Sequence, residues 1–302
     1  MKVHIMLGMN KLPLAKRAQI LAMLCEGSSM RSISRVADVS INTVSKLPVE
    51  AGEACATFHD ANVHGVKAKR VQVDEIWAFV YAKEKNVGGA EKAPDGAGDL
   101  WTWTALDADS KLIVSYFVGD RDGECAAWFM NDVARRLANR VQLTSDGHRA
   151  YLEAVEGAFG ADVDYAQLVK MYGASSDGTK GRYSPAECTG IRKTKVEGNP
   201  DMKHVSMSYV ERSNLTMRMQ MRRFTRLTNA FSKKAENHLH ALALYFMFYN
   251  FGRIHKTLRV SPAMAAGVSD HLWSWEDIAE MIDAAHAKPA KRGPYKVKSI
   301  DV

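Results

Sequence analysis

Three carboxylates have sequence settings that point to shared chemistry. Asp74 interrupts an apolar, strand-like run, where a charge is costly unless a partner stabilises it. Asp146 ends another apolar run at a glycine turn, and strand ends in alternating α/β folds open onto a crevice. Glu211 falls in the first turn of a predicted helix, within SYVERSN. Each acid alone has an ordinary explanation, as a surface charge, a turn former or a helix-terminus charge. Their order, with separations of 72 and 65 positions, suits a single site.

Such a site needs cations. Converging carboxylates repel, raise one another's pKa and destabilise the fold unless a counter-ion is present. Mg²⁺ prefers oxygen ligands and retains waters and phosphate oxygens, so a few carboxylates are enough to hold it. Two such ions, about 3.5 to 4 Å apart, can activate the attacking oxygen and stabilise the leaving oxygen of an in-line phosphoryl displacement. We therefore predict that Asp74, Asp146 and Glu211 are both the catalytic residues and the metal ligands.

The predicted helix that carries Glu211 is also rich in arginine. Helical patterning runs from Ser208 to about Thr228, and three arginines fall 7, 11 and 15 residues after Glu211. At about 100° per residue these offsets place them on one broad face with Glu211. Arginine can grip phosphate groups bidentately while nearby acids hold metal. A solvated basic face is the alternative. The predicted DNA contacts on this helix are Arg212, Arg218, Arg222, Arg223 and Arg226.

Composition agrees with a polyanionic partner. The chain has 41 Lys and Arg against 34 Asp and Glu, a net charge of +7 and a pI of about 9.1. Its hydrophobic fraction of 46% supports a buried core. The four cysteines form no CxxC pair, which argues against a zinc knuckle and a disulfide framework. No signal peptide fits the start, and the longest apolar stretch, 241–251, is too short to span a bilayer. A soluble, cytoplasmic protein is expected.

The elements around the acids predict an α/β domain. Strand-like runs come first, then helices and strands alternate, which is the order of a ribonuclease H-like mixed sheet flanked by helices. The predicted strands are Arg70–Ala82, Trp101–Asp107, Leu112–Val118, Val141–Ser145 and Val163–Leu168. The predicted helices are Glu124–Leu137, Arg149–Phe159 and, after the Glu211 helix, the strongly apolar Glu236–Phe251. Gly173–Asn199 is interpreted as a mobile basic loop, and Lys288–Lys298 as a basic, disordered tail.

The N-terminal part has the layout of a helix-turn-helix. Helices are predicted at Leu12–Cys25 and Met30–Ala37, and a third starts at Ile41 with Ser40 as its N-cap. Pro48 is expected to end the third helix early. In a helix-turn-helix the last helix faces the major groove, and its polar residues here are Asn42, Thr43, Ser45 and Lys46. A plain three-helix bundle without DNA contact is the alternative.

Three regions follow from these elements. Residues 1–65 are predicted to form an all-α helix-turn-helix DNA-binding domain and connector. Residues 66–267 are predicted to form the catalytic domain, with a basic loop at 173–203. Residues 268–302 are predicted to form a C-terminal helix and the basic tail.

Four segments resemble bacterial insertion-sequence DDE transposases, and are similar to the insertion sequence one type. VQVDEIWAFV resembles the first-Asp strand, LTSDGHRAYL the second-Asp motif and SYVERSNLTMRMQMRRFTRLTNAFSKK the glutamate helix, while YNFGRIHKTLRVSPAMAAG resembles the closing segment. The resemblance covers about Arg70 to Gly267. It implies a ribonuclease H-like catalytic domain, two Mg²⁺ or Mn²⁺ ions, cleavage at element ends and transfer of a 3′ hydroxyl to target DNA. Relatives of that type often carry an N-terminal zinc-binding segment, for which this chain has no cysteine spacing, so end recognition would fall to the helix-turn-helix.

Two element ends must be held together during such a reaction, so a homodimer or larger assembly is expected. Glu75 points to the opposite face of a regular strand from Asp74 and is a weaker site candidate. Two other functions stay open. One is a DNA-binding regulator with a relic catalytic domain, and the other is a ribonuclease H-like nuclease without strand transfer.

Overall fold

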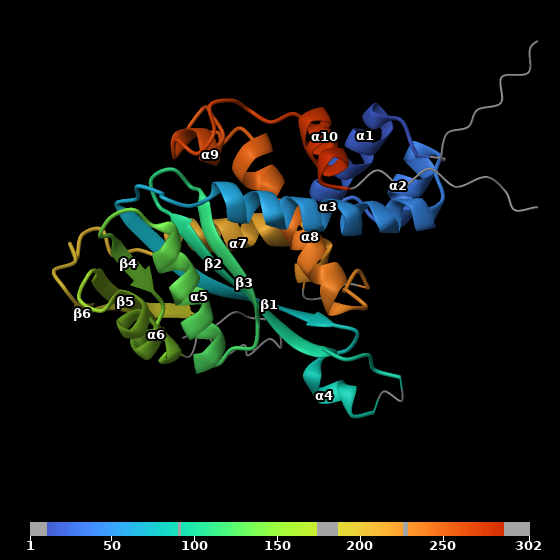
Figure 1. Ribbon diagram of the computed structural model, residues 1–302. Helices are drawn as coiled ribbons and strands as arrows, with labels where there is room; N and C mark the ends of the chain where they lie inside the picture. Colours follow the sequence, from blue (N-terminus) through green and yellow to red (C-terminus); the bar gives the residue numbers. More distant parts are fainter. Residues whose placement is uncertain (1–10, 90–91, 174–186, 226–228, 287–302) are drawn as a thin grey trace, which may run out of the picture.

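A six-stranded mixed sheet flanked by helices lies at the centre of the chain (Figure 1). The computed structural model describes residues 11–89, 92–173, 187–225 and 229–286. The strands are β1 Arg70–Val80, β2 Gly98–Asp107, β3 Ile113–Gly119, β4 Gln142–Ser145, β5 Asp164–Gly173 and β6 Glu187–Glu197. Their order in the sheet is β3-β2-β1-β4-β5-β6.

The pairing directions confirm the predicted ribonuclease H-like fold. Strands β1, β2 and β3 pair antiparallel, as two consecutive hairpins. Strand β4 then pairs parallel with β1, and β5 parallel with β4, each reached through a helical crossover. Parallel neighbours need such a crossover, which is why helix Gly123–Arg136 separates β3 from β4 and helix Ala150–Phe159 separates β4 from β5. The parallel step places the end of β4 beside the middle of β1.

Helices cover both faces of the sheet. They are α1 Leu14–Cys25, α2 Met30–Ala37, α3 Ile41–Asn62, α4 Glu84–Val87, α5 Gly123–Arg136, α6 Ala150–Phe159, α7 Ser208–Gln220, α8 Ala235–Met247, α9 Pro262–Ala265 and α10 Trp275–Ala285. A 3₁₀ turn at Arg222–Phe224 and a π turn at Phe248–Gly252 follow α7 and α8. None of the helices in the described ranges is both long and apolar enough to cross a membrane.

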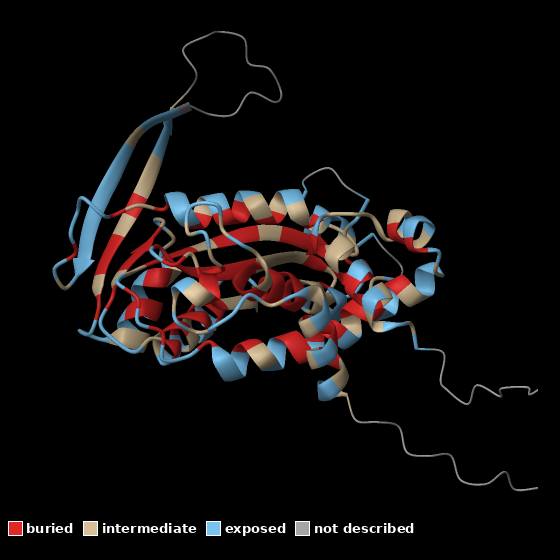
Figure 2. Cartoon of the chain, turned by 90° about the horizontal axis from the view of Figure 1, so that it is seen from above, coloured by how far each residue is buried: buried red, intermediate tan, exposed pale blue. Residues whose placement is uncertain are grey.

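Alternation along β1 divides the core into two clusters. Val71 and Val73 belong to a cluster that includes residues of α5 and α6, whereas Ile76 and Ala78 belong to one that includes residues of α7 and α8. Successive side chains of a strand point to opposite faces, so a strand covered on both sides is apolar throughout. Figure 2 shows the result, a central sheet buried from both sides. In this setting the charged pair in the middle of β1 stands out.

The three N-terminal helices form as predicted, and the Ser40 hydroxyl accepts a hydrogen bond from the Thr43 amide at the start of α3. The expected effect of Pro48 is wrong, because α3, which is 22 residues long, continues through Pro48 to Asn62. A proline inside a helix costs about 3 kcal/mol. Here α3 buries an apolar face that includes Val44, Leu47 and Ala51, and it packs along α8, which offsets that cost. The boundary at residue 65 stays a prediction, since α1–α3 share one hydrophobic cluster with the sheet.

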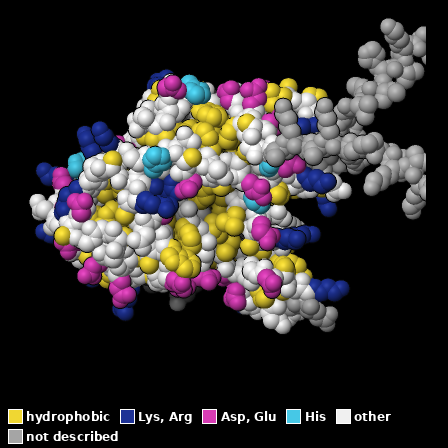
Figure 3. All heavy atoms as spheres, viewed as in Figure 1, with side chains coloured by type: hydrophobic (Ala, Val, Ile, Leu, Met, Phe, Trp, Pro, Cys, Tyr) yellow, Lys and Arg dark blue, Asp and Glu magenta, His cyan; other side chains and the backbone are white. Residues whose placement is uncertain are grey.

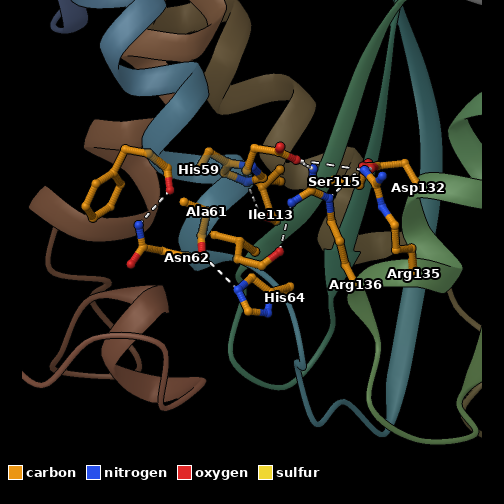
Figure 4. Close-up of polar contacts among 12 residues, drawn as sticks. His59, Ala61, Asn62, His64, Ile113, Ser115, Asp132, Arg135 and Arg136 are labelled. Carbon is orange, nitrogen blue, oxygen red and sulfur yellow. Dashed lines mark hydrogen bonds and ion pairs between the residues drawn. The ribbon is translucent and has the colours of Figure 1, made fainter. Parts of the chain in front are cut away.

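A buried polar network joins α3 to α5 (Figure 4). Arg136 donates to Asp132 at 2.6 Å, to Asp60 at 2.7 Å and to the Val63 carbonyl at 2.8 Å. Asp132 also accepts a hydrogen bond from Ser115 of β3 at 2.6 Å. Because each of the three guanidinium nitrogens of Arg136 has an oxygen partner, the burial of this charged group is compatible with a stable fold. The network fixes the end of α3 against the sheet.

The interpretation of Gly173–Asn199 as a loop is wrong in part. Residues 187–197 form β6, which pairs antiparallel with β5, and β5 itself extends to Gly173. Figure 2 shows this pair reaching out from the body with β6 exposed. Pairing at an exposed edge depends on backbone hydrogen bonds, so it leaves no apolar alternation in the sequence. Residues 174–186 of the predicted loop lie outside the described residues.

The predicted helix Ser208–Thr228 is also too long. Helix α7 ends at Gln220, and Met221 adopts an extended conformation with φ −119° and ψ 97°. The side chains of Met221 and Phe224 are buried, so the chain turns into the core. Arg222 therefore lies on the 3₁₀ turn, and the three arginines do not share one α-helix. Arg226 and the tail 288–298 lie outside the described residues.

Candidate active site

The three predicted acids line one cavity of about 640 Å³. Asp74 comes from the middle of β1, Asp146 follows β4 and Glu211 lies in the first turn of α7. The cavity is also lined by Arg121, His148, Arg149, Lys170 and Tyr172, among others. The fold thus brings residues 74, 146 and 211 together from three separate elements.

Asp74 is positioned by contacts between β1 and α7. The Asn214 amide donates a hydrogen bond to Asp74 Oδ2 at 2.8 Å. Two positions earlier on β1, Gln72 Oε1 accepts hydrogen bonds from the backbone amides of Tyr209 and Val210, each at 3.0 Å. These amides belong to the first turn of α7, where no intrahelical partner exists. Gln72 therefore satisfies the start of the helix and sets its distance from Asp74.

Asp146 lies where two paired strands separate. The β1–β4 ladder ends at the pair Gln72 and Thr144. Beyond that point the strands no longer bond to each other, and Asp146 lies next to the β1 acids. Its Oδ1 accepts a hydrogen bond from the His148 amide at 2.9 Å, which holds the turn after β4. The carboxylate remains about a third exposed, at 36% of its side-chain surface, so it opens to the cavity.

Cationic side chains contact the acids. Lys170 Nζ of β5 lies 2.5 Å from Glu211 Oε1. Arg121 lies 3.5 Å from Asp146 Oδ2 and 3.8 Å from Glu75 Oε1. The Arg121 guanidinium also sits over the ring of Trp101, 4.9 Å from its centroid. Two cations therefore offset part of the acidic charge.

Burial and mutual repulsion shift the acids on β1. Burial, followed by the charge of Asp146, raises the pKa of Asp74 to about 7. The same two causes in the same order raise the pKa of Glu75 to about 8, although Arg121 opposes the shift. Burial and the neighbouring negative charge therefore disfavour the ionised form of both side chains at neutral pH.

Glu75 reaches the same cluster from the other side of β1. Ligand oxygens of Asp74, Glu75 and Asp146 lie within 4.8 Å of one another. The Glu75 side chain is 1% exposed, and its Oε1 has no hydrogen-bond partner. Hard carboxylate oxygens, one of them buried and unpartnered, are a donor set that fits Mg²⁺ or Mn²⁺.

Sequence reasoning missed three residues that contact the predicted acids. Arg121 and Lys170 gave no signal, since each comes near the acids only through the tertiary fold. Asn214 had one, because it follows Glu211 by three positions and i, i+3 side chains share a helix face.

The predicted DNA contacts divide by exposure. Asn42, Ser45 and Lys46 are exposed at the start of α3, and Thr43 is half-buried. Among the predicted contacts on α7 and the 3₁₀ turn after it, Arg212 and Arg222 are exposed and Arg218 is half-buried. Arg223 donates to the Ser232 hydroxyl at 2.7 Å and to the Asn237 carbonyl at 3.0 Å, which favours a structural role. On the face in Figure 3, basic and acidic side chains are interspersed, so net charge alone indicates no DNA path there.

Comparison with known proteins gave distant structural likenesses. No family model matches the chain, and no curated protein does. The Mos1 transposase paired-end complex with left transposon end is 15% identical, with a TM-score of 0.19, over 51% of this chain and 60% of that chain. A piggyBac transposase synaptic complex with hairpin DNA is 6% identical, with a TM-score of 0.39, over 93% and 73%. The Mos1 strand transfer complex is 14% identical, with a TM-score of 0.23, over 80% and 79%. At these TM-scores the likenesses support no argument about function, and the fold assignment rests on the strand order and pairing described above.

The raised pKa values predict an unusual dependence of stability on pH. In the presence of a chelator, the folded state binds more protons at Asp74 and Glu75 than the unfolded state does. The free energy of unfolding should therefore fall as pH rises from 6.5 to 8, by up to about 1.4 kcal/mol per pH unit for each group. Buried His59, with a pKa lowered to about 4, acts in the opposite sense but only below its unfolded value of 6.5.

Urea unfolding at pH 6.5, 7.2 and 8.0, with EDTA and with Mg²⁺, would measure this dependence. Mg²⁺ should flatten the fall, and so should the double change Asp74→Asn with Glu75→Gln. A free energy of unfolding that rises over this pH range in EDTA would show that the pKa values of Asp74 and Glu75 are not raised.

Proposed function

We propose that the chain is a DDE-type transposase that cleaves DNA at the ends of an insertion sequence and joins the 3′ ends to target DNA. The observation that carries the proposal is the meeting of Asp74, Asp146 and Glu211 in one open cavity bordered by Arg121, Arg149 and Lys170. Acids that hold metal, surrounded by cations that contact phosphate, are what hydrolysis and transfer of a phosphodiester require.

Each residue has a defined part in this proposal. Asp74, Asp146 and Glu211 hold two Mg²⁺ or Mn²⁺ ions, which supply activation of the attacking oxygen and stabilisation of the leaving oxygen. Asn214 keeps the Asp74 carboxylate facing the cavity through its 2.8 Å hydrogen bond. Arg121 and the exposed Arg149 contact the phosphodiester, and Lys170 leaves Glu211 for a phosphate oxygen when DNA enters.

DNA is therefore the proposed partner, as both element ends and target. The exposed residues of α3, within a helix-turn-helix at residues 1–65, and Arg212, Arg218 and Arg222 are the proposed contacts outside the cavity. A homodimer or larger assembly holding two ends, working in the cytoplasm, completes the proposal.

The test is a reaction of the full chain with Mg²⁺ and DNA that carries the inverted repeats flanking its gene, together with a supercoiled target plasmid. We expect nicks or breaks at the repeat ends and covalently joined products on a sequencing gel. EDTA should remove both. Binding of the repeats without cuts would instead indicate a regulator with a relic domain, and cuts without joined products would indicate a nuclease.

A further inference from the structure

We propose that Glu75 is a direct ligand of the metal ion held between Asp74 and Asp146, so that the first ion is bound by three carboxylates and Glu211 serves the second ion. This inference rests on the proposed function, because it assigns the metal ligands of the same site. It changes the role of Glu75 from a strand residue facing away to a member of the site.

The first support is distance. Oxygens of Asp74, Glu75 and Asp146 all lie within 4.8 Å of one another. Mg²⁺ binds oxygens at about 2.1 Å, so two of its ligands are at most about 4.2 Å apart. Movements of less than about 1 Å would thus place all three oxygens on one ion. Glu211 is not a member of this close group.

The second support is the unsatisfied state of Glu75. Its side chain is 1% exposed and Oε1 accepts no hydrogen bond. The nearest cation, Arg121 Nε, is 3.8 Å away, which is beyond hydrogen-bond distance. A buried carboxylate oxygen without a hydrogen-bond partner is costly, and a fold retains such an oxygen where something else binds it. Glu211 is different, because it is 40% exposed and already paired with Lys170 at 2.5 Å.

The third support is the floor beneath the cluster. Trp103 and Tyr151 are fully buried there, with ring centroids 5.5 Å apart, and His148 packs on both rings at 6.0 Å. The Tyr151 hydroxyl also lacks a hydrogen-bond partner. Aromatic packing on this side leaves the Asp74 and Asp146 side as the direction from which an ion can reach Glu75.

Binding of Mn²⁺ to the full-length, metal-stripped chain tests the assignment, with free Mn²⁺ measured by electron paramagnetic resonance. Glu75→Gln keeps the shape of the side chain but removes its charge. We expect it to lower the affinity for the more tightly bound ion at least tenfold. Glu211→Gln should lower the affinity for the second ion only. Asp162→Asn, on an exposed surface residue, is the matched control and should change neither.

Thermal unfolding provides a second readout, and its measurement in EDTA does not depend on binding. Glu75→Gln should match or exceed the wild-type melting temperature in EDTA and gain less from added Mn²⁺. Glu75→Asp, which retains the charge on a shorter side chain, should bind Mn²⁺ with intermediate affinity. Unchanged affinity in Glu75→Gln beside a large loss in Asp146→Asn would overturn this inference and leave the proposed function standing. Absence of Mn²⁺ binding to the wild-type chain would instead count against the proposed function itself.

Discussion

Asp146→Asn is expected to lower DNA cleavage and strand transfer by at least about a thousandfold while leaving DNA binding intact. The change removes one anionic oxygen from the group formed by Asp74, Glu75 and Asp146. Stabilisation of transition-state charge by a bound metal is worth several kcal/mol, and about 4 kcal/mol corresponds to a thousandfold in rate. DNA binding should persist or improve slightly, because the variant carries one negative charge fewer beside Arg121.

Initial rates on end-containing DNA, with a gel-shift measurement of affinity on the same preparation, would test this expectation. Asp162→Asn is again the matched control, since it makes the same chemical change at an exposed position 3.7 Å from Arg140. Cleavage by Asp146→Asn at more than a tenth of the wild-type rate would refute the assignment of Asp146 to the metal.

Asn250→Ala is expected to destabilise the fold by about 3 kcal/mol. Asn250 is fully buried in the π turn after α8, and its amide bonds to both backbone groups of Ile113. Its Oδ1 accepts from Ile113 N at 2.9 Å, and its Nδ2 donates to Ile113 O at 3.0 Å. The side chain thereby replaces a neighbouring strand at the start of edge strand β3. A buried backbone group left unpaired costs about 1 to 3 kcal/mol.

The loss should be close to the sum of two such costs, reduced because His59 Nε2 lies 3.3 Å from the same Ile113 oxygen. Urea unfolding of Asn250→Ala would measure it. Asn131→Ala removes an exposed amide that bonds only within α5, and should change stability by less than about 0.5 kcal/mol. Equal stability of the two variants would show that Asn250 does not support β3.

Asn250 lies within YNFGRIHKTL, one of the segments that resembles transposases. In the folded chain its contacts are structural, because its side chain bonds to the backbone of β3 and it is not among the residues that line the cavity.

Patterns of short range predicted much of the fold. The apolar strands, the hairpin between β2 and β3 and the Ser40 cap depend on neighbouring residues, so they can be identified from the sequence. Strand β6 and the end of α7 could not be identified in this way. Edge pairing uses backbone groups that nearly every residue has, and α7 ends because Met221 and Phe224 find places in a core formed by distant segments.

The sequence by itself determined which three acids were worth considering and what chemistry they could support together. Only the tertiary structure decided which other residues lie next to them. The parallel pairing of β1 with β4 stops at Gln72, and beyond that residue Asp146 lies next to the two β1 acids. Arg121 and Lys170 arrive from other elements. Distances between segments far apart in the chain depend on how the whole core packs, and no local pattern of residues records them.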